Sequence, residues 1–368
     1  MKHIIISVTS DMVTDQRVHR TAITLHEAGY KVAVFARCKN DSLPLPPVPY
    51  HIYRTRLWAE KGLLFYALYN IRLFFYLINT KKNILWSNDL DTLLPNFIIS
   101  RLFGLKLIYD SHEYFTGVPE LLHRPMVRNI WKIIERAIFP YLKYVITVNQ
   151  SIADIYSQEY NVKINVVRNL PMPILNKQIQ TPDILQYIYH PIIIYQGALN
   201  ADRGIEEMIQ AMEWIPNAIL LIIGSGDLDN KIRQYREASH RRDFIILAGK
   251  IPYTQLPAYT CKATLGLSFE KPTNINYIYS LPNKIFDYIQ AGVPVLATKL
   301  PEISTIIDTF GIGNYIPNHN PQDIAHTITQ LLADKDLLAT YKNNCATAAS
   351  TLNWNTEKQK IIQLFENL

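Results

Sequence analysis

The chain has 368 residues, 48% hydrophobic and 18% charged, which excludes a disordered protein and predicts two domains of ordinary size. Its net charge of +6 suits an anionic ligand or a bilayer surface but lacks the clustered excess of a dedicated nucleic-acid binder, so we expect no nucleic-acid partner. Three widely spaced cysteines and an N-terminus without signal-peptide features favour a cytoplasmic protein.

The first half of the chain alternates short apolar strands with amphipathic helices. The expected strands are His3–Thr9, Tyr30–Arg37, Asn83–Ser87, Lys106–Tyr109, Tyr144–Val148 and Ile164–Val167. The expected helices are Gln16–Ala28, residues 61–79, Leu93–Phe103, Arg128–Phe139 and Ser151–Tyr160. This alternation is typical of a parallel sheet that is covered by helices on both faces.

The same rhythm restarts after a polar stretch with prolines between Pro171 and Pro191. The expected strands are Ile192–Gln196, Ala218–Ile223, Phe244–Leu247, Leu265–Ser268 and Pro294–Ala297. The expected helices are Gly204–Met212, Leu228–Ser239, Thr254–Tyr259, Lys284–Ala291, Pro301–Asp308, Pro321–Ala333 and Thr356–Leu368. We therefore expect two doubly wound parallel-sheet domains, at 1–172 and 173–353, with residues 354–368 packing back on the first. Such a pair would bind a ligand in the cleft between them, at the carboxyl ends of the strands.

Two segments raise the question of membrane contact. Residues 62–79 are apolar and only just long enough to span a bilayer, but Arg72 lies near their centre, which favours a buried or interface-lying helix. Residues 120–143 place five basic side chains among apolar and aromatic ones. That pattern is typical of a helix on an anionic bilayer and equally of an ordinary surface helix.

The stretch from Ser280 to Thr298 predicts a loop, a short helix and a buried strand. The helix N-terminus carries unpaired N–H groups and a partial positive charge, which suit a phosphate, and Lys284 lies on its first turn. Asp287 follows one turn later and is able to accept hydrogen bonds from hydroxyls. The combination indicates a nucleotide site, with a packed helix and a surface lysine as the alternative.

Six segments occur in an order and spacing that resembles the nucleotide-sugar-dependent glycosyltransferases of the GT-B fold, in particular glycosyltransferase family 4. They are DQRVHR with HEAGYKV, IYDSHEYF, YQGALNADRGIEEMIQAM, IIGSGDL, LAGKIPYTQLPAY and LPNKIFDYIQAGVPVLAT. The resemblance covers nearly the whole chain. It implies two Rossmann-like domains, an acceptor-binding first domain and a donor-binding second domain.

The resemblance implies two cations for the donor's diphosphate. The family has an arginine soon after a glycine and a lysine further on; here Ala198 takes the first position, Arg203 matches the second, and Lys284 supplies another cation. The forked guanidinium of Arg203 suits two phosphate oxygens. The alternative for Arg203 is an ion pair with Glu206 or Glu207.

The resemblance also implies the remaining donor contacts. Gly197, Gly224 and Gly226 would let the backbone approach the ligand, Ile251 lies in the segment that reads the base, and Asn283 stands at the start of the phosphate-binding helix. The family has two glutamates eight positions apart, the second of which holds the ribose. Asp287 matches that second position, Tyr279 takes the first, and Glu270 lies outside the spacing.

His112 follows an expected buried strand and so lies at its carboxyl end. In the family a histidine at this place lies near the donor sugar, and a neutral imidazole would hydrogen-bond a sugar hydroxyl or act in acid–base chemistry. Asp110 and Glu113 would orient His112 or bind acceptor hydroxyls; the alternative is a structural histidine. Asp11, Asp15 and Arg17 occupy the first strand–helix loop, where the acceptor or the diphosphate is expected.

The tripeptide Asp89-Leu90-Asp91 resembles the DxD metal motif of the other major glycosyltransferase fold. Because it lies between a strand and a helix, we interpret it as a helix cap and expect no metal site and no cofactor.

The expected function is transfer of a sugar from a UDP- or GDP-linked donor to a glycan or lipid-linked acceptor, in bacterial-type cell-surface synthesis, without a metal. Family membership implies retention of the anomeric configuration. Two alternatives stay open. A UDP-sugar epimerase of the same architecture would turn over the donor without an acceptor, and a non-catalytic partner subunit would tolerate the loss of His112.

Overall fold

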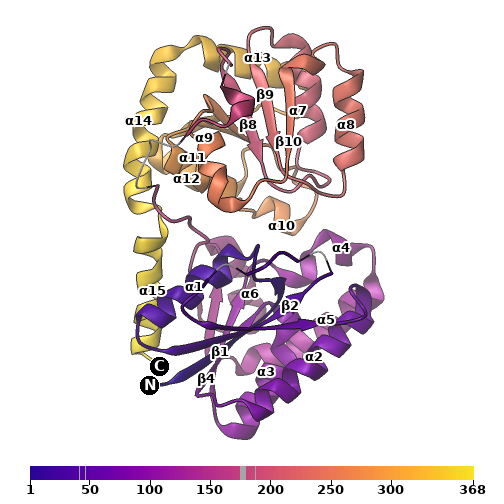
Figure 1. Ribbon diagram of the computed structural model, residues 1–368, viewed down its shortest axis with the longest axis vertical. Coiled ribbons are helices and arrows are strands. Elements are labelled where there is room, and N and C mark those ends of the chain that lie inside the picture. The colour runs from indigo at the N-terminus through magenta and orange to yellow at the C-terminus, as the bar shows by residue number, and fades with distance from the viewer. Residues whose placement is uncertain (41, 46, 175–179, 187) are drawn as a thin grey trace. The chain divides into compact units, whose positions relative to one another are not determined.

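The computed structural model describes residues 1–40, 42–45, 47–174, 180–186 and 188–368. The chain forms two compact units: unit 1 contains Met1–Asn169, Asn274–Asn276 and Glu357–Leu368, and unit 2 contains Leu170–Thr273 and Tyr277–Thr356 (Figure 1). Part of the linker expected between Pro171 and Pro191, namely 175–179 and 187, lies outside the described residues.

Unit 1 is built on a seven-stranded sheet of order β3-β2-β1-β4-β5-β6-β7, in which every neighbouring pair is parallel. The strands are β1 (His3–Asp11), β2 (Lys31–Cys38), β3 (His51–Arg56), β4 (Ile84–Asn88), β5 (Lys106–Ser111), β6 (Tyr144–Thr147) and β7 (Ile164–Val166). The helices are α1 (Gln16–Glu27), α2 (Gly62–Asn79), α3 (Leu90–Phe103), α4 (Pro119–Leu122), α5 (Pro125–Ile138), α6 (Gln150–Tyr160) and α15 (Trp354–Glu366).

Helices cover both faces of this sheet. Alternate strand residues such as Ile5, Leu85 and Tyr109 pack with α2, α3, α5 and α6 in one buried cluster. On the other face, α15 brings Phe365 against Trp86, with ring centroids 6.0 Å apart. Glu357 of the same helix accepts a hydrogen bond from the Arg168 N–H at 2.7 Å, so the C-terminal helix belongs to unit 1 from Glu357 onward.

Unit 2 repeats the design with a six-stranded parallel sheet of order β10-β9-β8-β11-β12-β13. Its strands are β8 (Ile192–Gln196), β9 (Ile219–Ile223), β10 (Ile245–Gly249), β11 (Leu265–Ser268), β12 (Val295–Ala297) and β13 (Gly313–Tyr315). Its helices are α7 (Ile205–Ala211), α8 (Asp229–Ala238), α9 (Leu256–Thr260), α11 (Asn283–Ala291), α12 (Pro301–Phe310), α13 (Pro321–Ala333) and α14 (Lys335–Thr351). The short helix α10 (Ile275–Ile278) begins in unit 1 and ends in unit 2.

The two faces of this second sheet carry two separate apolar clusters. One joins the strands to α7, α8 and α13, and the other joins them to α11, α12 and α14. The expected fold class, two doubly wound parallel-sheet domains, is therefore confirmed. Strands β3 and β13 and helices α4, α10 and α14 are additional to the elements expected from the sequence.

Strand order identifies one special edge in each unit. In unit 1 the order reverses between β1 and β4, and in unit 2 between β8 and β11. Ligands of open parallel sheets bind outside the carboxyl ends of the strands at such a reversal, because the connecting helices leave to opposite faces there. These two edges are the places where functional side chains are expected.

Helix α2 is long and apolar enough to cross a membrane by length and composition, with 22% of its residues buried. One face of α2 is packed through Phe65, Tyr69, Leu73 and Leu77. Arg72 donates to the Thr55 hydroxyl at 3.0 Å and to the Arg56 carbonyl at 2.8 Å. The helix is thus anchored along one side to unit 1.

Candidate active site

In unit 1, His112 lies between two carboxylates at the carboxyl ends of β4 and β5. Its Nδ1 is 3.2 Å from Asp89 Oδ2, its Nε2 is 3.7 Å from Asp110 Oδ2, and its backbone N–H donates to Asp89 Oδ1 at 2.8 Å. The His112 side chain is 23% exposed, whereas that of Asp110 is 1% exposed. The two carboxylates therefore hold the ring, which stays partly accessible to solvent.

Asp89 does not cap the helix that follows it, so the capping interpretation was wrong. Its side chain makes no cap hydrogen bond to α3 and binds His112 instead. Its backbone has φ 56° and ψ 170°, a region that is sparsely populated by residues other than glycine. Such a conformation persists only where its surroundings enforce it, which marks the Asp89–His112 contact as a constrained feature.

Asp110 is fixed by a buried two-pronged ion pair with Arg17 of α1. Arg17 Nη2 and Nε donate to the two oxygens of Asp110 at 2.7 and 3.1 Å, and Arg17 Nη1 donates to the Val167 carbonyl at 2.8 Å. Burial opposes ionisation of Asp110, but Arg17 and His112 outweigh it and hold its pKa well below the usual range. Asp110 thus supports His112 as a fixed negative charge and is too buried to bind an acceptor hydroxyl.

The two carboxylates change the expected charge of His112. Burial by itself would lower its pKa, but Asp89 and then Asp110 outweigh that effect and raise the pKa to about 9. A pKa in this range favours the imidazolium form of His112 at neutral pH over the neutral imidazole expected from the sequence. In this state both ring nitrogens carry a proton, and Nε2 is buried without a hydrogen-bond partner among the described residues.

The neighbouring acidic residues have other roles. Glu113 is exposed, and its backbone carbonyl accepts from the Ser111 hydroxyl at 2.7 Å. Asp91 accepts from the Thr9 hydroxyl at 2.5 Å, and burial, followed by the nearby Asp89, raises its pKa to about 8. In the first loop, Asp11 pairs with Arg54 at 3.1 Å and Asp15 accepts from the Val18 N–H at 3.0 Å as the cap of α1.

In unit 2, the glycines after β8 and β9 bring two loops together. A Cβ at Gly224, whose φ is +145°, would lie 1.8 Å from the Gly197 carbonyl oxygen. A Cβ at Gly226 would lie 2.5 Å from the Leu199 carbonyl oxygen. These glycines are required by the contact between the loops, and the same close approach leaves bare backbone at the edge where a ligand is expected.

Arg203 and Lys284 both contact Glu270, the glutamate that lies outside the expected spacing of eight positions. Lys284 Nζ is 2.8 Å and Arg203 Nη1 is 3.3 Å from the same oxygen, Glu270 Oε1. The expected alternatives were wrong: Lys284 is 6% exposed, so it is not a surface lysine, and Glu206 and Glu207 pair with Lys231 and Lys271. The three residues come from the carboxyl ends of β8 and β11 and from the first turn of α11.

Burial sets the charge balance of this cluster. Burial opposes ionisation of Glu270, but Lys284 and Arg203 outweigh it and lower its pKa to about 2. Burial lowers the pKa of Lys284 to about 8, although Glu270 opposes the change. The site therefore carries one net positive charge at neutral pH and loses it in mildly alkaline solution.

The remaining residues of the expected donor site lie around the same edge. Asp287 Oδ2 accepts from Gln196 Nε2 at 2.9 Å and its Oδ1 from the Tyr253 hydroxyl at 3.4 Å. Ile251 is half-buried against the second apolar cluster, and Asn283 is an exposed first residue of α11. Among the described residues, no group of three or more His, Cys, Asp or Glu side chains is arranged to hold a metal ion.

Two family models match the chain in the order of its units. The model described as Glycosyltransferase Family 4 matches residues 15–170, and the model described as Glycosyl transferases group 1 matches residues 184–347. The chitobiosyldiphosphodolichol beta-mannosyltransferase of Debaryomyces hansenii is 24% identical over 287 residues, which are 68% of this chain and 60% of that relative. The chain thus spans less than two thirds of that relative's length.

Solved structures show the same fold. Sucrose-phosphate synthase from Thermosynechococcus elongatus is similar with a TM-score of 0.79 at 17% identity, covering 100% of this chain and 99% of that one. HepE from Anabaena, solved in complex with UDP-glucose, has a TM-score of 0.76 at 14% identity, covering 100% of both chains. With both halves matched in order and the whole fold shared, the chain belongs to the glycosyltransferases of the GT-B fold and is family 4-like.

Proposed function

We propose that this protein transfers a hexosyl group from a UDP- or GDP-linked sugar to a hydroxyl of a glycan or lipid-linked acceptor, in cell-surface glycan synthesis of the bacterial type. The observation that carries the proposal is the convergence of Arg203 and Lys284 beside the N-terminus of α11, at the strand-order reversal of unit 2. Two cations and a helix N-terminus there suit a diphosphate. The name of the Debaryomyces relative describes a lipid-diphosphate acceptor, and HepE was solved with UDP-glucose, which support the two substrate classes.

The residues of unit 2 divide the work of binding the donor. Arg203 and Lys284 stabilise the negative charge that develops on the diphosphate as the glycosidic bond breaks. Because two fixed cations do this, we propose a metal-independent reaction. Asp287, oriented by Gln196, accepts hydrogen bonds from the ribose hydroxyls, and the backbone at Ile251 contacts the base.

The protonated state of His112 favours retention of the anomeric configuration. A histidine that already carries its proton cannot take one from the acceptor hydroxyl. We propose that the departing diphosphate oxygen takes this proton instead, and it lies on the face of the sugar from which it leaves. An acceptor that attacks on that face yields a product with the donor's configuration. His112 itself donates hydrogen bonds to substrate hydroxyls.

Product analysis tests this function. The purified protein is incubated with UDP-glucose and GDP-mannose, with and without EDTA, and with lipid-diphosphate-linked saccharides as acceptors. We expect acceptor-dependent release of the nucleoside diphosphate that survives EDTA, and NMR of the product should show the donor's anomeric configuration. Arg203→Gln and Lys284→Met should each reduce turnover by about 100-fold, as loss of one preorganised donor does. Arg233→Gln, on the exposed face of α8, should not.

Other outcomes identify the rival functions. Interconversion of the donor sugar without an acceptor indicates an epimerase. Absence of donor binding by the wild-type protein indicates a non-catalytic subunit.

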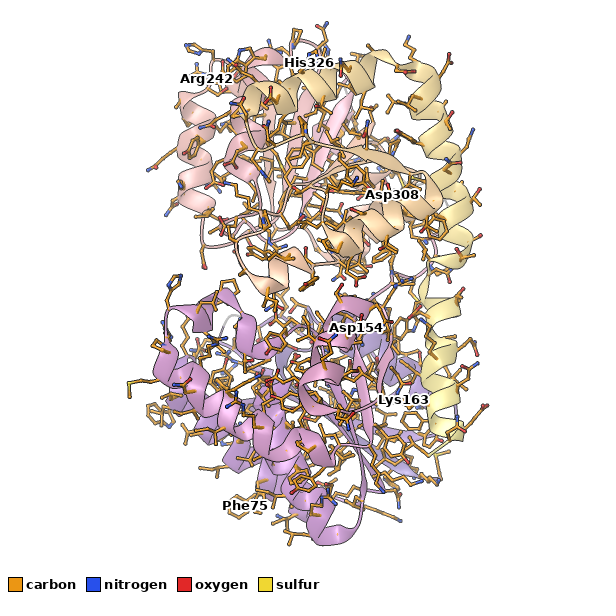
Figure 2. The ribbon with its side chains drawn as sticks, turned by 180° about the vertical axis from the view of Figure 1, so that it is seen from behind. Phe75, Asp154, Lys163, Arg242, Asp308 and His326 are labelled. Atoms are coloured by element: carbon orange, nitrogen blue, oxygen red, sulfur yellow. The ribbon has the colours of Figure 1, made fainter. Side chains whose placement is uncertain are left out.

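We further propose that unit 1 contacts the cytoplasmic face of a membrane through α2, α3 and α5, called here the α2–α3–α5 surface. It exposes large apolar side chains from all three helices: Leu63, Leu64, Ile71, Phe75, Ile78, Leu94, Ile98, Leu102, Phe103, Met126, Ile130 and Ile133. Phe75 is labelled at the outer surface of unit 1 in Figure 2. The exposed charged side chains described on these helices are all arginines, namely Arg72, Arg101, Arg128 and Arg136. Apolar contact with arginines suits an anionic bilayer.

Vesicle sedimentation tests the α2–α3–α5 surface. The protein should sediment with vesicles that contain phosphatidylglycerol, less with pure phosphatidylcholine, and less at high salt because the arginine contribution is screened. Phe75→Glu should abolish sedimentation, whereas Tyr189→Glu, at a side chain of unit 2 that is 91% exposed, should not. Equal sedimentation of the two variants would contradict the proposal.

A further inference from the structure

Glu270 occupies a position that the proposed donor site does not explain. Its side chain is fully buried at the carboxyl end of β11, and it carries a negative charge where a diphosphate is expected to bind. A buried carboxylate would repel that ligand unless neighbouring cations neutralise its charge. The role of Glu270 therefore depends on the groups that it contacts.

All the contacts described for Glu270 hold other groups in place. Oε1 accepts from Lys284 Nζ at 2.8 Å and from Arg203 Nη1 at 3.3 Å, while Oε2 accepts from the Ser268 hydroxyl of β11 at 2.7 Å. One oxygen is thus fixed to the sheet and the other to both cations. This arrangement positions the two cations relative to the strand ends.

Each cation is supported on a second side by an aromatic ring. Lys284 Nζ lies 4.0 Å from the centroid of the Tyr195 ring, and Arg203 Cζ lies 4.7 Å from that of the Tyr277 ring. Glu270 and the rings leave each cation little freedom to reorient. Arg203 Nε is buried without a hydrogen-bond partner among the described residues.

Resting on the proposed function, we infer that Glu270 is a positioning residue: it holds Arg203 and Lys284 as a preformed pair of cations for the diphosphate of the donor. It does not contact the reacting atoms. Its negative charge lies behind the two cations and is the counter-ion that allows both to stay charged in a buried site.

The charged and titratable groups that face Lys284 explain why Glu270 is needed to keep this lysine protonated. Arg203 approaches from the loop before α7, Tyr195 from β8, Glu270 from the end of β11, and Asp287 lies one turn further along α11. Burial and Arg203 both favour loss of the Lys284 proton, and Glu270 opposes them. Without Glu270, Lys284 should release its proton at a lower pH, and the diphosphate would then meet one cation.

The first measurement needs no nucleotide. Lysine labelled with ¹³C at Cε reports its protonation state by NMR, and the Lys284 signal is the one missing from Lys284→Arg. We expect Glu270→Gln to move the titration of Lys284 to lower pH by at least one unit. Glu207→Gln, which removes a carboxylate that pairs with Lys271 at 2.6 Å, is the matched control and should leave it unchanged. A Lys284 titration that is identical in Glu270→Gln and wild type overturns the proposal.

The second measurement is the affinity for UDP-glucose and GDP-mannose between pH 6 and 9, a range in which their diphosphates do not titrate. Above the pKa of Lys284, binding of the diphosphate requires uptake of one proton, so the affinity falls about tenfold per pH unit. In Glu270→Gln this fall should begin at a lower pH, in a range where the affinity of the wild type is constant. A role in folding alone would weaken binding equally at every pH, and that result would also overturn the proposal.

The two measurements separate this proposal from the proposed function. If the wild type binds neither sugar nucleotide while the Lys284 titration still shifts in Glu270→Gln, the donor assignment fails and the positioning of Lys284 by Glu270 stands. If Glu270→Gln does not fold, Glu270→Asp keeps the charge but shortens the side chain. Because the shorter side chain moves the carboxylate away from Lys284 Nζ, the Lys284 titration should still move to lower pH, and a titration identical to that of the wild type would overturn the proposal.

Discussion

Replacement of Asp89 by asparagine tests the electrostatic account of His112. Asparagine keeps the shape and an acceptor for the His112 N–H, and it adopts a positive φ more readily than most residues, so the backbone at φ 56° is disturbed little. What it removes is the charge 3.2 Å from the ring. Loss of an opposite charge at this distance lowers a histidine pKa by about 1–3 units.

The same shift predicts the direction of a stability change. The pKa of His112 rises from 6.5 to about 9 on folding, which at about 1.4 kcal/mol per unit corresponds to about 3 kcal/mol. Because the folded pKa is the higher one, this contribution is fully present below about pH 6.5 and is lost as pH rises through about 9. The wild type should therefore lose free energy of unfolding across this range, and Asp89→Asn should lose less of it.

NMR titration of the histidine Cε1–H signals measures the effect directly. The chain has ten histidines, and the His112 signal is the one missing from His112→Gln. Asp91→Asn is the control, since Asp91 lies in the first turn of α3, two residues after Asp89. Burial, followed by the nearby Asp89, raises its pKa to about 8, so that it is largely neutral at pH 7. The reasoning is refuted if His112 titrates near 6.5 in the wild type, or if Asp89→Asn leaves its pKa unchanged.

Two further substitutions test the packing beneath the two sites. Arg17→Met should lower the free energy of unfolding, measured in urea, by about 3–5 kcal/mol because it leaves Asp110 buried and unpaired. Adding Asp110→Asn should recover part of that loss, and no recovery would contradict the ion-pair account. Gly224→Ala should prevent unit 2 from folding normally, because its Cβ would lie 1.8 Å from the Gly197 carbonyl oxygen. The control Gly249→Ala, also at positive φ but in open space, should cost only about 1–2 kcal/mol; circular dichroism melts that match for the two variants would be the contrary result.

The alternation of apolar runs and helical stretches was sufficient to predict the fold class, since β1, β4, β8 and β9 are buried along most or all of their length. The elements that escaped prediction have weak apolar patterns. Strand β3 is an edge strand in which only Thr55 is fully buried, and α14 buries only Cys345 and Ala348. Such segments are specified by the neighbours they pack against, which a local pattern does not contain.

The candidate sites were predictable only as far as their chain positions allowed. Arg203, Lys284 and His112 follow strands or open helices and were expected at strand ends on that ground. Glu270 also lies just after a strand, β11, which is beside β8 in the sheet. Its place after an expected strand was the signal in the sequence that could have indicated a site residue. A fixed spacing of eight residues does not reach Glu270, because it meets Lys284 and Arg203 through the fold, 14 and 67 positions away in sequence.

The same reason explains the error at Asp89. A carboxylate between a strand and a helix is most often a cap, because the first N–H groups of the helix are the nearest unpaired donors. In this chain β5 lies beside β4, so the backbone and ring of His112 offer donors from a different loop. Whether Asp89 binds the N–H groups of its own helix or the donors of His112 depends on which strands are neighbours in the sheet. A local sequence pattern does not contain that order.

The two units share one electrostatic arrangement at their strand-order reversals. In each, a carboxylate fully buried at a strand end accepts a hydrogen bond from an arginine and lies beside a second cation: Asp110 with Arg17 and His112, and Glu270 with Arg203 and Lys284. A lone buried cation would shed its proton, and a lone buried carboxylate would take one up. Placed together, they keep His112 and Lys284 charged where a substrate's oxygens are expected. The carboxylates are therefore needed for what the cations do, and their substitution should change pH dependence before it changes the fold.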